Sequence, residues 1–187
     1  MSNKSTSFNE IRNIKVNNKV LDFSTPKIMG VLNLTPDSFY DGGMNKNRDI
    51  WLSRTEGMLK SGADIIDIGA VSTRPGAKEI SVDEELRRII EPLKLLTNTF
   101  PKAIFSIDTY RSQVAKETVD AGAHIINDIS GGTMDSDMFK TIADLKVPYI
   151  LMQIHGTPQT MMNSPIDANI VSIVTNFFQK AVEKLSE

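Results

Sequence analysis

From residue 27 onward, short apolar runs alternate with longer stretches in which apolar residues recur every three or four positions. Glycine, proline or serine marks each break between them. A short run without polar alternation is typical of a strand buried on both faces, and the longer periodic stretches are typical of amphipathic helices. The alternation therefore predicts repeated βα units around a parallel sheet. The predicted strands cover residues 28–34, 63–68, 103–107, 124–127 and 147–152.

Stretches of helical period follow the predicted strands. Residues 51–59 form one of them, and Gly62 stands where a left-handed helix cap is expected. Ser81 and Glu84 have the spacing of a capping box at the start of the next helix. Before the first of these units, residues 14–23 predict a small hairpin. Further helices are predicted over residues 112–121, over 138–145 and from 170 onward.

The composition excludes several classes of protein. A formal net charge of -2 provides no basic surface for nucleic acid. No apolar run approaches the length that spans a membrane, and the polar first residues do not form a secretory signal, so we expect a cytoplasmic protein. Without cysteine, a metal ion has only oxygen atoms and the two histidines, His124 and His155, as ligands. Mg2+, which prefers oxygen, fits this set best.

Residues 27–43, with the sequence KIMGVLNLTPDSFYDGG, change from an apolar strand to a polar loop. In parallel sheets the loops that leave the carboxyl ends of the strands converge on one crevice, and ligands bind there. Asn33 stands at the end of the predicted strand and is therefore expected at this edge.

Residues 64–76, with the sequence DIIDIGAVSTRPG, make a second change from strand to loop. Arg74 lies just beyond the strand, and its planar guanidinium matches the oxygens of a phosphate. An isolated arginine would more often pair with a nearby acid such as Asp83. Asp67, inside the strand, is either a ligand contact or a structural acid satisfied by backbone amides, and the sequence leaves both readings open.

Two further polar clusters follow predicted strands, around Asp108 and around Asn127. Both are expected at the same edge as Asn33 and Arg74. A carboxylate buried there needs a donor partner, and a carboxamide both donates and accepts, so the pair suits a heterocyclic ligand. The alternatives are an N-cap role for Asp108 at the helix near Ser112 and a loop-bracing role for Asn127.

Taken together, the motifs GVLNLTPDSFYDGG, DIIDIGAVSTRPG, SIDT and NDISGG resemble those of dihydropteroate synthases, which join a pterin to p-aminobenzoate. The resemblance implies an α/β fold of the (β/α)8 TIM barrel type. Such a barrel takes roughly 250 residues. In the 187 residues of this chain we therefore expect one pterin-binding domain, residues 1–187, with only about the first five βα units and an N-terminal hairpin.

The resemblance also implies roles for individual residues. Asp108 and Asn127 would bind the pterin edge, and Asp67 is a further candidate on the same side. Thr73 would hold the charged tail of the substrate. Met152 would line the pterin ring, although a methionine at a strand end is also typical of plain core.

The remaining implied roles concern the leaving diphosphate and the amine. Asn33 would bind Mg2+, and Arg74 would neutralise the diphosphate. Two acids of the first loop would stabilise a carbon that becomes cationic, and two ring-bearing residues would frame p-aminobenzoate. These four are Asp37 and Asp41, and Phe39 and Pro75. A loop without a direct role is an equally open reading for them.

Other readings stay open. The family has an aspartate, a lysine and an Arg-x-His pair after the fifth unit, and nothing in this chain matches them, so we expect weak binding and slow turnover from the chain alone. A non-catalytic pterin-binding module and the pterin-binding domain of corrinoid methyltransferases are the alternative functions. A homodimer is the usual assembly of the family, but its contact is formed by late helices that have no match in this chain, so the oligomeric state stays open. His155 receives no role.

Overall fold

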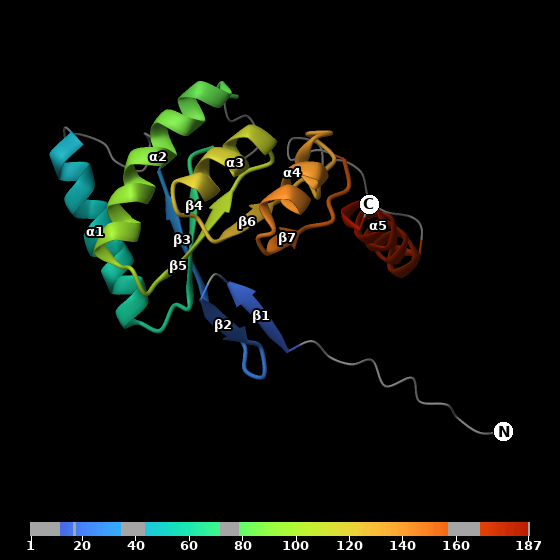
Figure 1. The fold of residues 1–187 in the computed structure, drawn as a ribbon, viewed down its shortest axis with the longest axis horizontal. Helices are drawn as coiled ribbons and strands as arrows, with labels where there is room; N and C mark the ends of the chain where they lie inside the picture. The colour runs from blue at the N-terminus through green and yellow to red at the C-terminus, as the bar shows by residue number, and fades with distance from the viewer. Residues whose placement is uncertain (1–11, 17, 35–43, 72–78, 157–168, 187) are drawn as a thin grey trace.

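The structure, a computed structural model, describes residues 12–16, 18–34, 44–71, 79–156 and 169–186 (Figure 1). Its centre is a parallel sheet of five strands that follow one another in chain order. This confirms the βα ladder predicted from the sequence, with strand ends that differ by one or two residues. The strands are β3 (Met29–Asn33), β4 (Ile65–Gly69), β5 (Ile104–Asp108), β6 (Ile125–Asp128) and β7 (Tyr149–Leu151).

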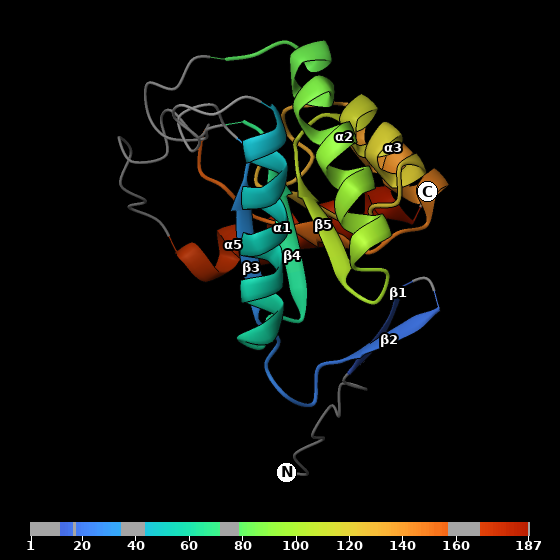
Figure 2. The same ribbon diagram turned by 90° about the vertical axis from the view of Figure 1, so that its left-hand side faces the viewer.

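Helices alternate with these strands, and each packs against the next one along the chain. Figure 2 shows the first three side by side over one face of the sheet. None of the helices in the described part of the chain has the length and apolar character needed to cross a membrane. The helices are α1 (Met44–Lys60), α2 (Val82–Thr99), α3 (Ser112–Asp120), α4 (Met138–Leu145) and α5 (Ile170–Leu185).

The sheet has an apolar outer face under the helices and an inner face that changes character along the strands. Outward side chains such as Ile66, Phe105 and Ile126 are fully buried against the helices. On the inner face, the lower ends of the strands carry Ile65 and Ile104, which pack against the hairpin. The hairpin therefore closes the amino-terminal end of the sheet and leaves the carboxyl end for polar residues.

The hairpin consists of β1 (Asn13–Val16) and β2 (Lys19–Asp22), paired antiparallel as predicted. Its inward side chains Val16 and Leu21 are buried in the lower cluster. Lys19 Nζ also donates to the backbone oxygens of residues before β5, including Ala103 at 3.2 Å. Burial and these bonds hold the hairpin against the end of the sheet.

The prediction that residues 28–34 form a fully buried strand is wrong. In the described structure β3 is an edge strand, paired only with β4. Leu32 is buried under the helices, but Val31 on the inner face is 60% exposed. An apolar run indicates that both faces tolerate apolar residues, and it does not show which face a neighbour covers.

The residues predicted to cap helices mostly do so. Gly62 has a φ of 98° and ends α1, as expected. Ser81 caps α2 by accepting a hydrogen bond from Glu84 N at 3.2 Å. In the described part of the chain the second half of the predicted capping box does not form, because the Glu84 carboxylate accepts from Arg87 and Arg88 instead.

Replacing Gly131 with alanine is expected to lower the free energy of unfolding by about 3 kcal/mol. Gly131 has a φ of 61° in the turn after β6, and an added Cβ would overlap the Met152 carbonyl oxygen and lie 2.5 Å from Phe177 Cζ. Chemical denaturation measures the loss. The matched control is Gly57→Ala in α1, where a Cβ meets nothing within 4 Å. Its free energy of unfolding is expected to rise by about 0.5 to 1 kcal/mol, because alanine favours the helix more than glycine does. Equal changes in both variants would contradict the close packing of this turn.

Candidate functional site

One row of residues crosses the sheet at the carboxyl ends of its strands. Asn33 on β3 is in register with Gly69, Gly69 with Asp108, and Asp108 with Asn127. Register partners in a sheet point to the same face, so the three side chains share the inner face. The structure thus brings together Asn33, Asp108 and Asn127, as the sequence predicted.

Gly69 keeps the middle of this row open. A Cβ at this position would lie 3.3 Å from Asp108 Oδ2 and 3.6 Å from Asn33 Oδ1. The oxygens of two different strands therefore border the same small space. Carboxylate and amide oxygens are ligands that a hard cation such as Mg2+ accepts. No group of three or more His, Asp or Glu side chains that could hold a metal ion occurs in the described residues.

A second polar layer lies one step deeper on the inner face. Asp67 is in register with Ser106, and both are almost fully buried. Asp67 Oδ2 accepts a hydrogen bond of 3.1 Å from Asn127 Nδ2. Asp67 Oδ1 and Ser106 Oγ have no hydrogen-bond partner in the part of the chain that is described. The partner of Asp67 is thus a side-chain amide and not the backbone amides that one reading of the sequence suggested.

The carboxyl groups of this site titrate abnormally. Burial, followed by the negative charges of Asp67, Glu85 and Asp128, raises the pKa of Asp108 from 3.8 to about 7. Burial also raises the pKa of Asp67, and neighbouring Ser106 and Asn127 offset part of that change. The Asp108 carboxyl group makes no hydrogen bond or ion pair with the described residues. An unpaired carboxylate of this kind is a strong acceptor for the N–H groups of a ligand, and such groups concentrate at functional sites.

A buried ionic network supports the end of β5. Glu85 on α2 is 1% exposed, and its carboxylate accepts from Thr109 Oγ1 at 2.8 Å and from Arg111 Nη1 at 2.7 Å. The sequence prediction missed this network. One feature of the sequence indicates such a network: Glu85 lies four residues before Ile89, and hence on the apolar stripe of α2.

The structure contradicts both alternatives to a ligand role, namely N-capping of α3 by Asp108 and bracing of the loop by Asn127. Other residues make these contacts. The N-cap of α3 is Arg111, and Ser112 N donates to Asp135 Oδ2 at 2.7 Å, so Asp108 does not cap this helix. The brace of the loop after β6 is Asp128, next to Asn127. Its carboxylate accepts from two backbone N–H groups and from Tyr149 OH at 2.6 Å.

Of the other residues considered in the sequence analysis, Met152 and His155 are described by the structure. Met152 follows β7 directly and is exposed, and its backbone N donates to Asp128 O at 3.3 Å. His155 is also exposed. The remaining predicted residues lie outside the described residues: Asp37, Phe39, Asp41, Thr73, Arg74 and Pro75.

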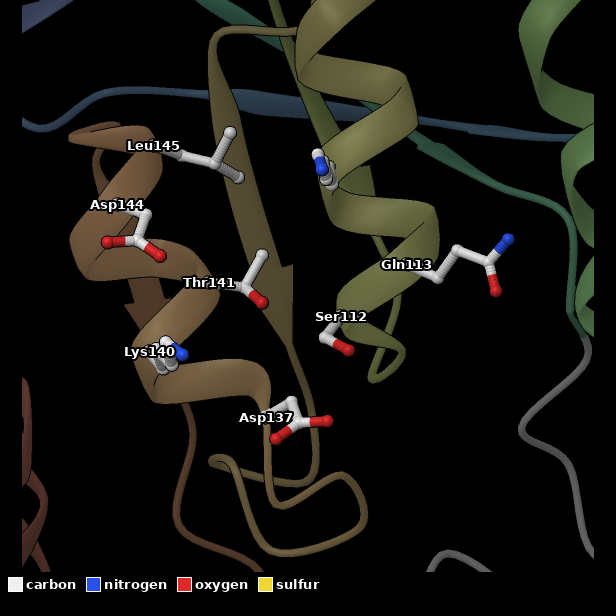
Figure 3. A pocket seen from close by; sticks show the side chains of 8 residues that line it. Ser112, Gln113, Asp137, Lys140, Thr141, Asp144 and Leu145 are labelled. Atoms are coloured by element: carbon white, nitrogen blue, oxygen red, sulfur yellow. The ribbon is translucent and has the colours of Figure 1, made fainter.

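A separate cavity of about 590 Å³ lies between α3 and α4 (Figure 3). Its lining has mixed charge, with Lys140 opposed by Asp137 and Asp144. None of the predicted site residues lines it. The row at the strand ends therefore remains the candidate site.

The sequence model of a family described as "Pterin binding enzyme" matches residues 29–187, which include all five strands of the parallel sheet. The chain belongs to the pterin binding enzyme family. Among its relatives, the dihydropteroate synthase of Escherichia coli is 38% identical over 167 residues, and a folate synthesis bifunctional protein of Arabidopsis thaliana is 46% identical over 155 residues. These alignments cover 89% and 81% of this chain.

Solved structures of this pterin-binding family have the same fold. The dihydropteroate synthase of Yersinia pestis, in complex with a sulfonamide drug, has a TM-score of 0.83 and 38% identity over 93% of this chain. The Burkholderia cenocepacia enzyme, in complex with 7,8-dihydropteroate, has a TM-score of 0.78 and 34% identity. The chain spans 62% and 58% of these two structures, 58% of the Escherichia coli protein and 32% of the Arabidopsis protein. Its sheet and helices correspond to part of a TIM barrel.

Proposed function

We propose that this chain acts as a dihydropteroate synthase, which condenses 6-hydroxymethyl-7,8-dihydropterin diphosphate with p-aminobenzoate to 7,8-dihydropteroate and pyrophosphate. The observation that carries the proposal is the row formed by Asn33, Asp108 and Asn127, in which the half-buried Asp108 carboxylate has no partner among the described residues. Relatives of that name, and a relative solved with 7,8-dihydropteroate, support it.

The pyrimidine edge of a pterin presents an amino group and a ring N–H. Asp108 accepts from these donors, and such a charge-assisted hydrogen bond contributes about 1.5 to 3 kcal/mol. Asn127 lies beside Asp108 in the sheet register and binds the same edge. Met152 lines one side of the ring. The pterin is thereby oriented with its methylene carbon toward the loops that follow the strands.

The reaction forms a C–N bond and breaks a C–O bond at that methylene carbon. Pyrophosphate leaves with the electron pair of the C–O bond, and the attacking amine loses a proton. Because an aromatic amine is a weak nucleophile, departure of pyrophosphate is the step that needs help. Thr73 and Arg74 hold the departing phosphates, Asp37 and Asp41 stabilise the cationic carbon, and Phe39 and Pro75 frame the p-aminobenzoate ring.

Asn33 is the residue that would hold Mg2+, with its amide oxygen at the strand end. When bound, the ion neutralises charge on the diphosphate. The proposed catalytic work of the chain itself is to bind the pterin edge, orient the methylene carbon and exclude water from it.

We expect the chain to release pyrophosphate only when both substrates are present. A coupled pyrophosphate assay measures release, and omission of p-aminobenzoate is the internal control. Lys140→Ala, in the cavity between α3 and α4, should leave the rate unchanged. Pterin binding without release would select a non-catalytic pterin-binding module instead, and transfer of a methyl group would select the methyltransferase alternative.

A further inference from the structure

One hydrogen bond joins the two polar layers of the inner face. Asn127 Nδ2 on β6 donates to Asp67 Oδ2 on β4, so the bond passes over the intervening strand β5. Asp67 is 5% exposed and lies two residues before Gly69, one layer beneath the row at the strand ends. Asp67 is therefore better placed to act on Asn127 than on a ligand.

A carboxamide has two ends with opposite character, and its neighbours decide which end points where. An ionised carboxylate only accepts, so it attracts the Nδ2 end and repels the Oδ1 end. We propose, on the basis of the proposed function, that Asp67 is a positioning residue that fixes the Asn127 amide with its carbonyl oxygen available to the pterin. Ser106, the register partner of Asp67, makes no competing hydrogen bond with Asn127.

This orientation determines which ligand edge the site accepts. Asn127 Oδ1 and the Asp108 carboxylate become neighbouring acceptors, because the two residues are register partners on adjacent strands. Two adjacent acceptors match an edge with two adjacent N–H donors, as in the 2-amino-pyrimidinone ring of a pterin. A lumazine, which carries a carbonyl oxygen in place of the amino group, would set an acceptor against an acceptor.

The test compares the dissociation constants of 6-hydroxymethylpterin and 6-hydroxymethyllumazine. We expect the unchanged chain to prefer the pterin by about 100-fold, since a site built for a donor rejects an analogue that lacks it. In Asp67→Asn the new amide either donates or accepts, so Asn127 can rotate and the preference falls at least about tenfold. A purely structural role of Asp67 would weaken both ligands equally, and an unchanged preference would overturn the proposal.

Ser106→Ala is the matched control, because it alters the same buried layer without touching the Asn127 bond. Its preference for the pterin over the lumazine should equal that of the unchanged chain. Thermal unfolding of each variant establishes that it is folded before binding is compared.

A second measurement does not depend on any ligand. In the free chain, NMR should show one Asn127 side-chain amide proton that is shifted downfield and exchanges more slowly than the amide of exposed Asn169, and Asp67→Asn should abolish the difference. If the chain binds neither ligand, the proposed function fails and this measurement alone decides the role of Asp67. Absence of the protected proton from the unchanged chain would overturn that role.

Discussion

Replacement of Arg111 with methionine is expected to lower the free energy of unfolding by about 3 to 5 kcal/mol, because it leaves a buried carboxylate without its cation. The Glu85 carboxylate is almost inaccessible to solvent, and Arg111 Nη1 lies 2.7 Å from Glu85 Oε2. Burial raises the pKa of Glu85, and Thr109 and Arg111 offset part of that change. Urea denaturation followed by circular dichroism measures the loss.

The control is Arg87→Met, which breaks an ion pair of similar length at the surface. Arg87 Nη2 lies 2.6 Å from Glu84 Oε2, but the arginine side chain is 76% exposed. Solvent screens such a pair, so the expected change is much smaller than that in Arg111→Met. Equal losses in the two variants would contradict the prediction that burial makes the Glu85 pair critical.

A double variant separates two contributions to the loss of stability, the unpaired charge of Glu85 and the lost packing of Arg111. Glu85→Gln removes the charge and keeps an acceptor for Thr109 Oγ1. Combined with Arg111→Met, it should recover at least half of the loss, because replacing both members of a buried ion pair is close to neutral. The loss in Arg111→Met alone should also shrink as the pH falls, because protonation neutralises Glu85, whose pKa is raised by burial.

Replacement of Asp108 with asparagine is expected to have two effects of opposite sign. Pterin affinity should fall by about 100-fold, because a charge-assisted acceptor becomes a neutral group with one donor end. The free energy of unfolding without ligand should rise by about 2 to 4 kcal/mol at pH 8, since each unit of pKa shift corresponds to about 1.4 kcal/mol.

The sign of the stability change follows from proton linkage. The pKa of Asp108 is about 7 in the folded chain and near 3.8 when unfolded, so the folded chain holds the extra proton between these values. The contribution of Asp108 to stability therefore falls as pH rises from about 4 to about 7, and the full penalty is present above that range. Asparagine has no such proton, so its stability advantage should grow over the same interval.

Denaturation at pH 5 and pH 8, combined with pterin titrations, tests both effects. The affinity of the unchanged chain should weaken below about pH 7, where Asp108 gains its proton, and that of Asp108→Asn should not follow this profile. Asp137→Asn, an exposed acid at the start of α4, is the control and should behave like the unchanged chain. Parallel stability curves for the unchanged chain and Asp108→Asn would rule out the raised pKa.

The order of elements could be read from the sequence, because helices and strands have local periods. Helix α4 was predicted over residues 138–145 and has those bounds, and the hairpin predicted over residues 14–23 has its strands at Asn13–Val16 and Lys19–Asp22. The common edge of Asn33, Asp108 and Asn127 was also predictable, since parallel strands place their carboxyl ends together. These conclusions need only the positions of residues relative to their own strand or helix.

Tertiary structure alone decided the finer properties of the site. Asn127 and Asp67 are 60 residues apart and on strands that are not neighbours, so their hydrogen bond depends on register across three strands. The raised pKa of Asp108 depends on burial and on charges from β4, α2 and β6. The exposure of Val31 depends on what covers the inner face of β3. Local sequence patterns carry no information on which distant side chains meet, because that is determined by how the packed strands and helices bring separate segments together.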